Sequence, residues 1–203
     1  DAVLSIGEHG SYHTNERGQV MYPRKRFFDE IVAVMKRSNR FVPVFNDKHL
    51  SYRWDWAKEM YDTAVEFGIP LMAGSSVPLA QRAPMVEITP GTEIEEAISI
   101  HGGPVESYDF HGLEVLQSMV EARRGGEAGV ARVQFLSGDD ILNAANKSWS
   151  LSLAAAAMAA EGNFSGEALS LPKFEPHGIL LEYNDGFRAT VLKVGNSGIR
   201  WNF

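Results

Sequence analysis

The sequence has 203 residues, of which 44% are hydrophobic and 22% are charged, so it can bury a sizeable core in one large or two small domains. Its net charge of −7 and its lack of an apolar run of membrane-spanning length argue against binding to nucleic acid and to membranes. The absence of cysteine excludes disulfides and thiolate metal sites.

Three short apolar segments alternate with two helical patterns at the start of the chain. Residues 2–6, 41–45 and 69–73 are the predicted strands, because each is a short, nearly continuous apolar run. Apolar residues recur at helical spacing within 27–35 and 54–65. This β–α–β–α–β order predicts a parallel sheet with right-handed crossovers, similar to part of a Rossmann domain.

Polar or glycine-rich residues follow each of these three strands. They occupy positions 7–9, 46–49 and 74–76. Because parallel α/β sheets bind ligands at the carboxyl ends of their strands, we expect these residues to lie at one binding site.

The pattern changes after residue 77, where prolines accumulate at positions 78, 84 and 90. We therefore predict two domains, residues 1–77 and 78–203. The second contains strand patterns at 94–100 and 130–136, a helical pattern over 139–160, and a hairpin over 178–194. The predicted fold class is α/β plus α+β: a partial Rossmann-like parallel sheet, then a mixed or antiparallel sheet with helices on one face.

Lys48 and His111 are the main candidates for chemistry. A lysine at a strand end can bind a substrate hydroxyl or a cofactor ribose, although Lys48 could instead be a surface residue or a partner for Asp47. His111 is predicted in the first turn of a helix, where the neutral imidazole that a general base needs is favoured. The alternative is a packed histidine that bonds to Asp109 or Ser107.

A metal site is a further hypothesis. Four histidines, with nearby carboxylates, could bind zinc or manganese in an isomerase or hydrolase. These residues are His9, His13, His49 and His111, with Glu8, Asp47 and Asp109. None of the pairs has a strong local metal-binding spacing, so we predict no metal ligands.

Three segments resemble the Gfo/Idh/MocA oxidoreductase family, which is the glucose–fructose oxidoreductase and inositol dehydrogenase type. In addition, the sequences of residues 7–10 and 45–49 are similar to those of a bacterial branch of this family. Residues 1–6 resemble the fourth strand of that family's nucleotide-binding domain. Residues 47–49, Asp-Lys-His, fall where the family has Glu-Lys-Pro. Residues 102–111 resemble the segment Gly-Gly…Asp-x-Gly-x-His that opens its catalytic helix.

The resemblance implies an NAD- or NADP-dependent oxidoreductase that acts on a sugar or cyclitol hydroxyl. Lys48 matches the catalytic lysine, which orients the hydroxyl, and His111 matches the histidine that takes its proton. The family's aspartate falls on Ser107 and the following glycine on Asp109, so Asp109 is expected to orient His111 or to bind a neighbouring hydroxyl. The residues expected to line the cofactor side are Gly7, Glu8, His9, Asn46 and Lys48.

The resemblance also implies that the chain is a fragment truncated at both ends. The family's first three strands and glycine-rich phosphate turn would precede Asp1, and its last strands would follow Phe203. The chain contains no G-x-G-x-x-G motif, so we expect it to bind a dinucleotide poorly by itself. We further expect a cytoplasmic homo-oligomer that assembles through the sheet of the second domain. The alternative function is a catalytically silent sugar-binding or scaffolding relative.

Overall fold

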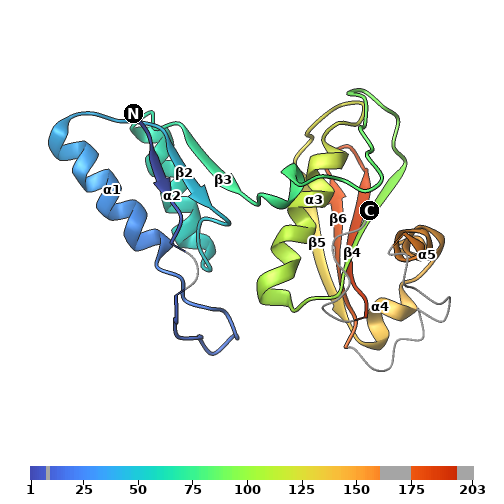
Figure 1. Cartoon of the computed structure of the whole chain (residues 1–203). Helices are drawn as coiled ribbons and strands as arrows, with labels where there is room; N and C mark the ends of the chain where they lie inside the picture. Colours follow the sequence, from blue (N-terminus) through green and yellow to red (C-terminus); the bar gives the residue numbers. More distant parts are fainter. Residues whose placement is uncertain (8–9, 161–174, 196–203) are drawn as a thin grey trace. The chain divides into compact units, whose positions relative to one another are not determined.

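The fold is described from a computed structural model, for residues 1–7, 10–160 and 175–195 (Figure 1). The chain divides into two compact units, Asp1–Ser76 and Val77–Phe203. Each unit has its own sheet and hydrophobic core.

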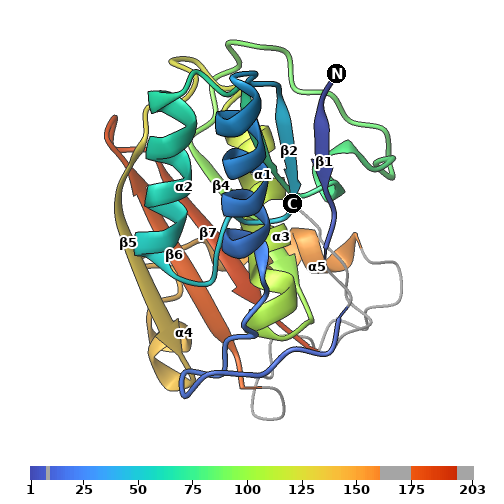
Figure 2. The ribbon, with the colours of Figure 1, turned by 90° about the vertical axis from the view of Figure 1, so that its left-hand side faces the viewer.

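The first unit is a three-stranded parallel sheet with two helices. Its strands β1 (Val3–Ser5), β2 (Val44–Asp47) and β3 (Leu71–Gly74) pair in that order. Helices α1 (Arg24–Ser38) and α2 (Trp54–Glu66) connect them and lie side by side on one face of the sheet (Figure 2). The β–α–β–α–β order and the parallel pairing agree with the sequence pattern.

The core of this unit lies between the helices and the sheet. It is made of the apolar residues that recur at helical spacing, together with residues of the middle of the sheet. Its buried members are Phe28, Val32, Met35, Val44, Met60, Ala64 and Ile69. The opposite face carries a row of paired apolar side chains, Leu4, Phe45 and Met72, of which Leu4 is 68% and Met72 is 67% exposed.

Strand β2 lies further along the chain than the predicted strand over 41–45. Its pairing with β3 begins where the N–H of Val44 donates to the carbonyl of Pro70, while the preceding Pro43 faces β1 and its carbonyl accepts a hydrogen bond from the N–H of Val3. Pairing then continues through Asn46 and Asp47. These two polar residues therefore belong to the strand itself.

The second unit is built around a four-stranded mixed sheet in the order β4-β7-β6-β5. Strand β4 pairs parallel to β7, and the other pairs are antiparallel. The strands are β4 (Glu96–His101), β5 (Val130–Ser137), β6 (His177–Tyr183) and β7 (Arg188–Lys193). The helical segments are η1 (Val77–Leu79), η2 (Val105–Asp109), α3 (Phe110–Val120), α4 (Asp139–Asn143) and α5 (Leu151–Ala159).

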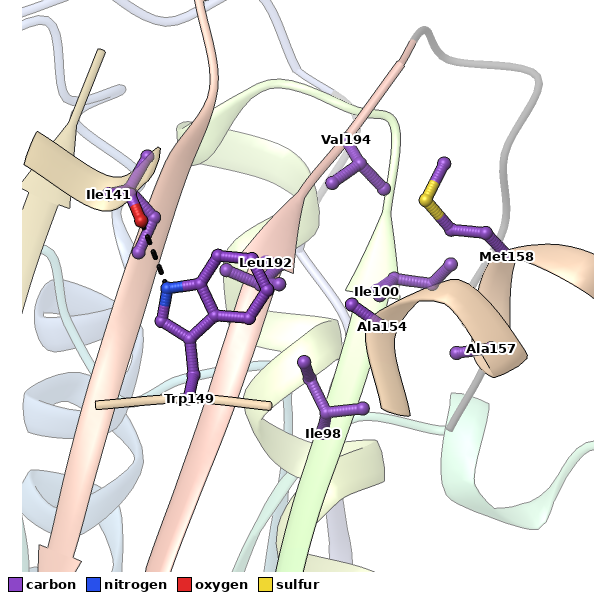
Figure 3. Packing of buried hydrophobic residues seen from close by; sticks show 9 residues of the cluster. All are labelled: Ile98, Ile100, Ile141, Trp149, Ala154, Ala157, Met158, Leu192 and Val194. Atoms are coloured by element: carbon purple, nitrogen blue, oxygen red, sulfur yellow. Dashed lines mark hydrogen bonds between the residues drawn. The ribbon is translucent and has the colours of Figure 1, made fainter. Parts of the chain in front are cut away.

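Helices pack on both faces of this sheet. Helix α3 packs against one face, where Ala189 and Val191 of β7 are buried. Helix α5 and Trp149 cover the other face, where Leu192 is buried (Figure 3). The inner strand β7 thus buries side chains on both faces, and of its four buried residues only Thr190 is polar. In this detail the structure differs from the expectation of helices on one face, while the predicted fold class is confirmed.

The helical pattern over 139–160 forms two helices. Between α4 and α5 the chain folds back, and the indole Nε1 of Trp149 donates to the carbonyl of Ile141 at 3.0 Å (Figure 3). Ser150 then caps α5 by accepting a hydrogen bond from the backbone N–H of Leu153. Within the parts of the chain described above, no helix is long and apolar enough to cross a membrane.

Candidate functional site

The carboxyl end of β2 is organised by the buried amide of Asn46. This side chain is 1% exposed. Its Nδ2 lies 3.4 Å from the carbonyl oxygens of Asp47 and Lys48 and 3.2 Å from that of His49, and it donates to all three. Asn46, predicted on the cofactor side, therefore holds the backbone that carries Lys48.

Lys48 lies directly after β2 in the left-handed backbone region, with φ of 72°. Its backbone exchanges two hydrogen bonds with Gly74 at the end of β3, with N–O distances of 3.0 and 3.1 Å. Its ammonium Nζ is 2.8 Å from Oδ2 of Asp47, and the two side chains are 17% and 15% exposed. Lys48 thus stands at the carboxyl edge of the parallel sheet, paired with its neighbour.

His49 contacts a residue that sequence reasoning did not identify. Nη1 of Arg24 lies 2.9 Å from Nε2 of His49. Because a guanidinium only donates, this imidazole nitrogen is the acceptor and carries no proton. Arg24 is 3% exposed, and its guanidinium lies over the ring of Tyr22 at 4.3 Å. Nothing in the local sequence distinguishes Arg24 from its basic neighbours Lys25 and Arg26, so its burial emerges only from packing.

Gly7, at the end of β1, lies beside the aromatic ring of Phe27. A Cβ on Gly7 would lie 2.3 Å from Cε2 of Phe27. The space that glycine leaves is therefore occupied by α1. Glu8 and His9, the other predicted cofactor contacts at this strand end, lie outside the described residues. The hypothesis that His9 is a metal ligand therefore also concerns a residue outside them.

In the second unit, Asp109 lies between two histidines. Its Oδ1 is 2.8 Å from Nε2 of His177 and 2.9 Å from Nε2 of His101, and its Oδ2 is 3.0 Å from Nε2 of His177. All three residues are buried. Burial opposes ionisation of Asp109, but its contacts with His101 and His177 outweigh that effect and lower the pKa of the carboxyl.

The two histidines differ in how their nitrogens are satisfied. Nε2 of His177 makes hydrogen bonds to both oxygens of Asp109. His101 is completely buried, and neither of its ring nitrogens makes a hydrogen bond with any residue that the structure describes. Its Nε2 nevertheless lies 2.9 Å from Oδ1 of Asp109, and this charge contact contributes to lowering the pKa of the Asp109 carboxyl.

Sheet register brings the histidines together. His101 ends β4 and His177 begins β6, and both are paired with Lys193 of the intervening strand β7. Side chains of directly paired residues point to the same face of a sheet. Lys193 directs its Nζ to the carbonyl of Glu175, at 3.4 Å. The π-helical turn η2 then brings Asp109 to the same place from the start of α3.

His111 lies in the first turn of α3, half-buried, with its ring 5.5 Å from that of Phe110. The sequence suggested Asp109 as its partner, whereas the carboxylate of Asp109 is engaged by His101 and His177. Those two histidines were not among the candidates. Each is a single histidine at a strand end, far from the other in the sequence, so a local motif could not reveal them.

No protein-family model matches the sequence, and no curated protein matches it. Among solved structures, the fold is similar to UDP-N-acetylglucosamine 3-dehydrogenase GnnA from Acidithiobacillus ferrooxidans, with 12% identity and a TM-score of 0.47 over 98% of this chain and 51% of that one. Biliverdin reductase from Synechocystis sp. PCC 6803, solved with biliverdin and NADP+, has 13% identity and a TM-score of 0.41 over 100% of this chain and 54% of that one. The chain thus spans about half the length of these proteins.

Proposed function

We propose that this chain supplies the substrate-handling residues of a nicotinamide-dependent oxidoreductase that acts on a hydroxyl group of a sugar or cyclitol. The observation that carries this proposal is the position of Lys48. It adopts a backbone conformation with φ of 72°, which non-glycine residues rarely adopt, at the carboxyl edge of a parallel sheet. Unfavourable backbone conformations concentrate at ligand sites, and this edge is where such sheets bind ligands.

In this proposal Lys48 binds the substrate hydroxyl. An ammonium group has three donors, and the ion pair with Asp47 holds it beside the sheet. A hydrogen bond from Lys48 would stabilise negative charge on the hydroxyl oxygen as its proton leaves. His111, at the start of α3, would accept that proton as a general base.

Asp109 is proposed as a positioning residue. Its carboxylate contacts His101 at the end of β4 and His177 at the start of β6. These contacts fix the end of η2, from which α3 and His111 continue. This role differs from direct orientation of His111 by a hydrogen bond, because the carboxylate oxygens are already engaged by the other two histidines.

Two of the residues expected on the cofactor side, Gly7 and Asn46, are already engaged within the first unit. The space beside Gly7 is filled by Phe27, and the amide of Asn46 is directed at backbone carbonyls. The sequence has no G-x-G-x-x-G turn. The contribution of this chain therefore concerns the substrate hydroxyl and its proton. We propose accordingly that residues 1–77 are the C-terminal half of a nucleotide-binding domain and that 78–203 form a substrate and oligomerisation domain.

Assembly into a homo-oligomer through the sheet of the second unit is also proposed. Among the described strands, β5 lies at the edge of its sheet, and its apolar side chains Val133 and Phe135 are 59% and 53% exposed. Edge strands with exposed apolar side chains favour association with another chain.

The test compares Lys48→Ala and His111→Ala with the parent, in the longest form of the protein that its coding sequence specifies. Reduction of NAD+ and NADP+ would be followed by absorbance with a panel of sugars and cyclitols, and nucleotide binding by fluorescence. We expect both variants to lose at least about 100-fold in kcat, the contribution of a positioned acid or base, while nucleotide binding is retained.

The matched control is Lys58→Ala, which removes an exposed lysine paired with Asp62 on α2 and should leave turnover unchanged. Turnover that survives in either site variant would contradict the assigned roles. A parent that binds a sugar but reduces neither nucleotide would overturn the oxidoreductase in favour of the silent sugar-binding relative.

A further inference from the structure

We propose that His101, Asp109 and His177 form a binding site for one divalent transition-metal ion of the kind that imidazole and carboxylate ligands select, such as zinc. Within the described parts of the chain, these three residues are the one grouping of potential metal ligands whose donor atoms all lie within 4.8 Å of one another. The inference is independent of the proposed oxidoreductase activity.

The donor set matches this class of ion. Two imidazole nitrogens and one carboxylate are a common three-ligand set for zinc and for non-haem iron. Ligand bonds of about 2.0–2.2 Å around one ion separate the donor atoms by roughly 3 Å or slightly more. The measured separations between Oδ1 of Asp109 and the two Nε2 atoms are 2.8 and 2.9 Å. A small outward movement of these side chains would therefore admit an ion.

His101 provides a second, independent indication of a ligand. Its side chain is fully buried, yet neither ring nitrogen has a hydrogen-bond partner among the described residues. A buried polar group without a hydrogen bond is costly and is rare in folded proteins. An ion bound at Nε2 would provide the missing interaction at the nitrogen that already faces Asp109.

The structure around His101 also favours a fixed ligand. Gly112 of α3 lies against the imidazole, and a Cβ there would be 3.2 Å from Cδ2 of His101 and 2.9 Å from Cγ1 of Val191. The ring is therefore seated between a helix and a strand. The ring of the second histidine, His177, is stacked on that of Phe135, with centroids 5.2 Å apart.

The position of the cluster indicates a structural ion. Its ligands come from the end of β4, the end of η2 and the start of β6, and all three are buried. An ion at this point would tie the start of α3 to two strands of the sheet. Structural metal ions stabilise a domain in this way because binding is coupled to folding.

The experiment uses the 203-residue chain after treatment with a chelator. Zn²⁺ binding would be measured by titration calorimetry, and Co²⁺ binding by the visible absorption that nitrogen and oxygen ligands produce. We expect one ion per chain, and slower hydrogen exchange in β4, η2 and β6 when Zn²⁺ is bound. Asp109→Asn and His177→Gln should each weaken binding at least about tenfold, as even indirect changes at metal sites do.

The matched control is His13→Gln, which removes an exposed histidine of the first unit and should bind Zn²⁺ as the parent does. A parent that takes up neither ion would overturn the proposal. So would binding that is lost in His13→Gln or unchanged in both ligand variants. If the ligand variants do not fold, the parent decides the question: Zn²⁺ that slows no exchange in β4, η2 and β6 contradicts this site.

Discussion

Two polar clusters, one at the end of β2 and one around Asp109, differ in how their side chains are satisfied. At the end of β2, the amide of Asn46 donates to three backbone carbonyls, and Lys48 pairs with Asp47. Around Asp109, His177 is hydrogen-bonded but His101 is not. In the first cluster, the hydrogen bonds of Asn46 and the ion pair of Lys48 satisfy these side chains and hold Lys48 at the edge of the sheet. The second contains a buried imidazole, that of His101, which has a charge contact with Asp109 but no hydrogen-bond partner among the described residues, and such a group is a feature expected where a ligand binds.

The largest expected effect comes from Asn46→Leu. This change removes the donor that satisfies the carbonyls after β2 and should lower the local free energy of unfolding by about 2 kcal/mol, the cost of unsatisfied buried polar groups. Hydrogen exchange of the amides in β2 and β3 measures it. Asn46→Asp, which keeps the shape but removes the N–H donors, should be at least as destabilising. Stability equal to that of the parent in both variants would show that the first cluster is not organised by this amide.

A smaller loss is expected for Gly112→Ala, which probes the packing of the second cluster. The added Cβ would lie 2.9 Å from Cγ1 of Val191 and 3.2 Å from Cδ2 of His101, and overpacking of this kind costs about 1–3 kcal/mol. Part of that cost is offset because alanine favours a helix over glycine by about 1 kcal/mol. We therefore expect a net loss of about 1 kcal/mol in hydrogen-exchange stability of α3.

The control for Gly112→Ala is Ser118→Ala, at an exposed position of the same helix, which should be neutral or slightly stabilising. If Gly112→Ala stabilises α3 as much as Ser118→Ala does, the imidazole of His101 is not packed against α3.

The smallest effect is expected for His101→Leu in the presence of a chelator. His101 keeps one charge contact, from Nε2 to Oδ1 of Asp109, whereas His177 bonds both carboxylate oxygens, so removal of the His101 imidazole should lower the stability of the second unit by no more than about 1 kcal/mol. Hydrogen exchange of the amides in β6 and β7 during urea unfolding would follow this unit. By comparison, His177→Leu removes hydrogen bonds to a buried carboxylate and should destabilise it more. Equal losses would mean that the two histidines are equally satisfied without a metal.

Much of the fold could be predicted from the sequence because its signals are local. Continuous apolar runs separated by helical periodicity indicate a parallel sheet, and the turn at Asn184, Asp185 and Gly186 indicates the hairpin of β6 and β7. Helix α3 begins at Phe110, so the sequence also placed His111 correctly in a first helical turn. The packing of α5 on the second face of the sheet was not predictable, since an alanine-rich helix has no strongly apolar face to orient it.

The sequence by itself determined that polar residues follow β2, that Lys48 is among them, and that a helix carrying His111 follows two glycines. Tertiary structure alone decided which polar groups meet. The amide of Asn46 turns back onto its own strand end, and Asp109 meets His101 and His177 instead of the neighbouring His111. The physical reason is sheet register: pairing of β4 and β6 with β7 places residues 101 and 177 on either side of Lys193, a proximity that sequence spacing does not encode.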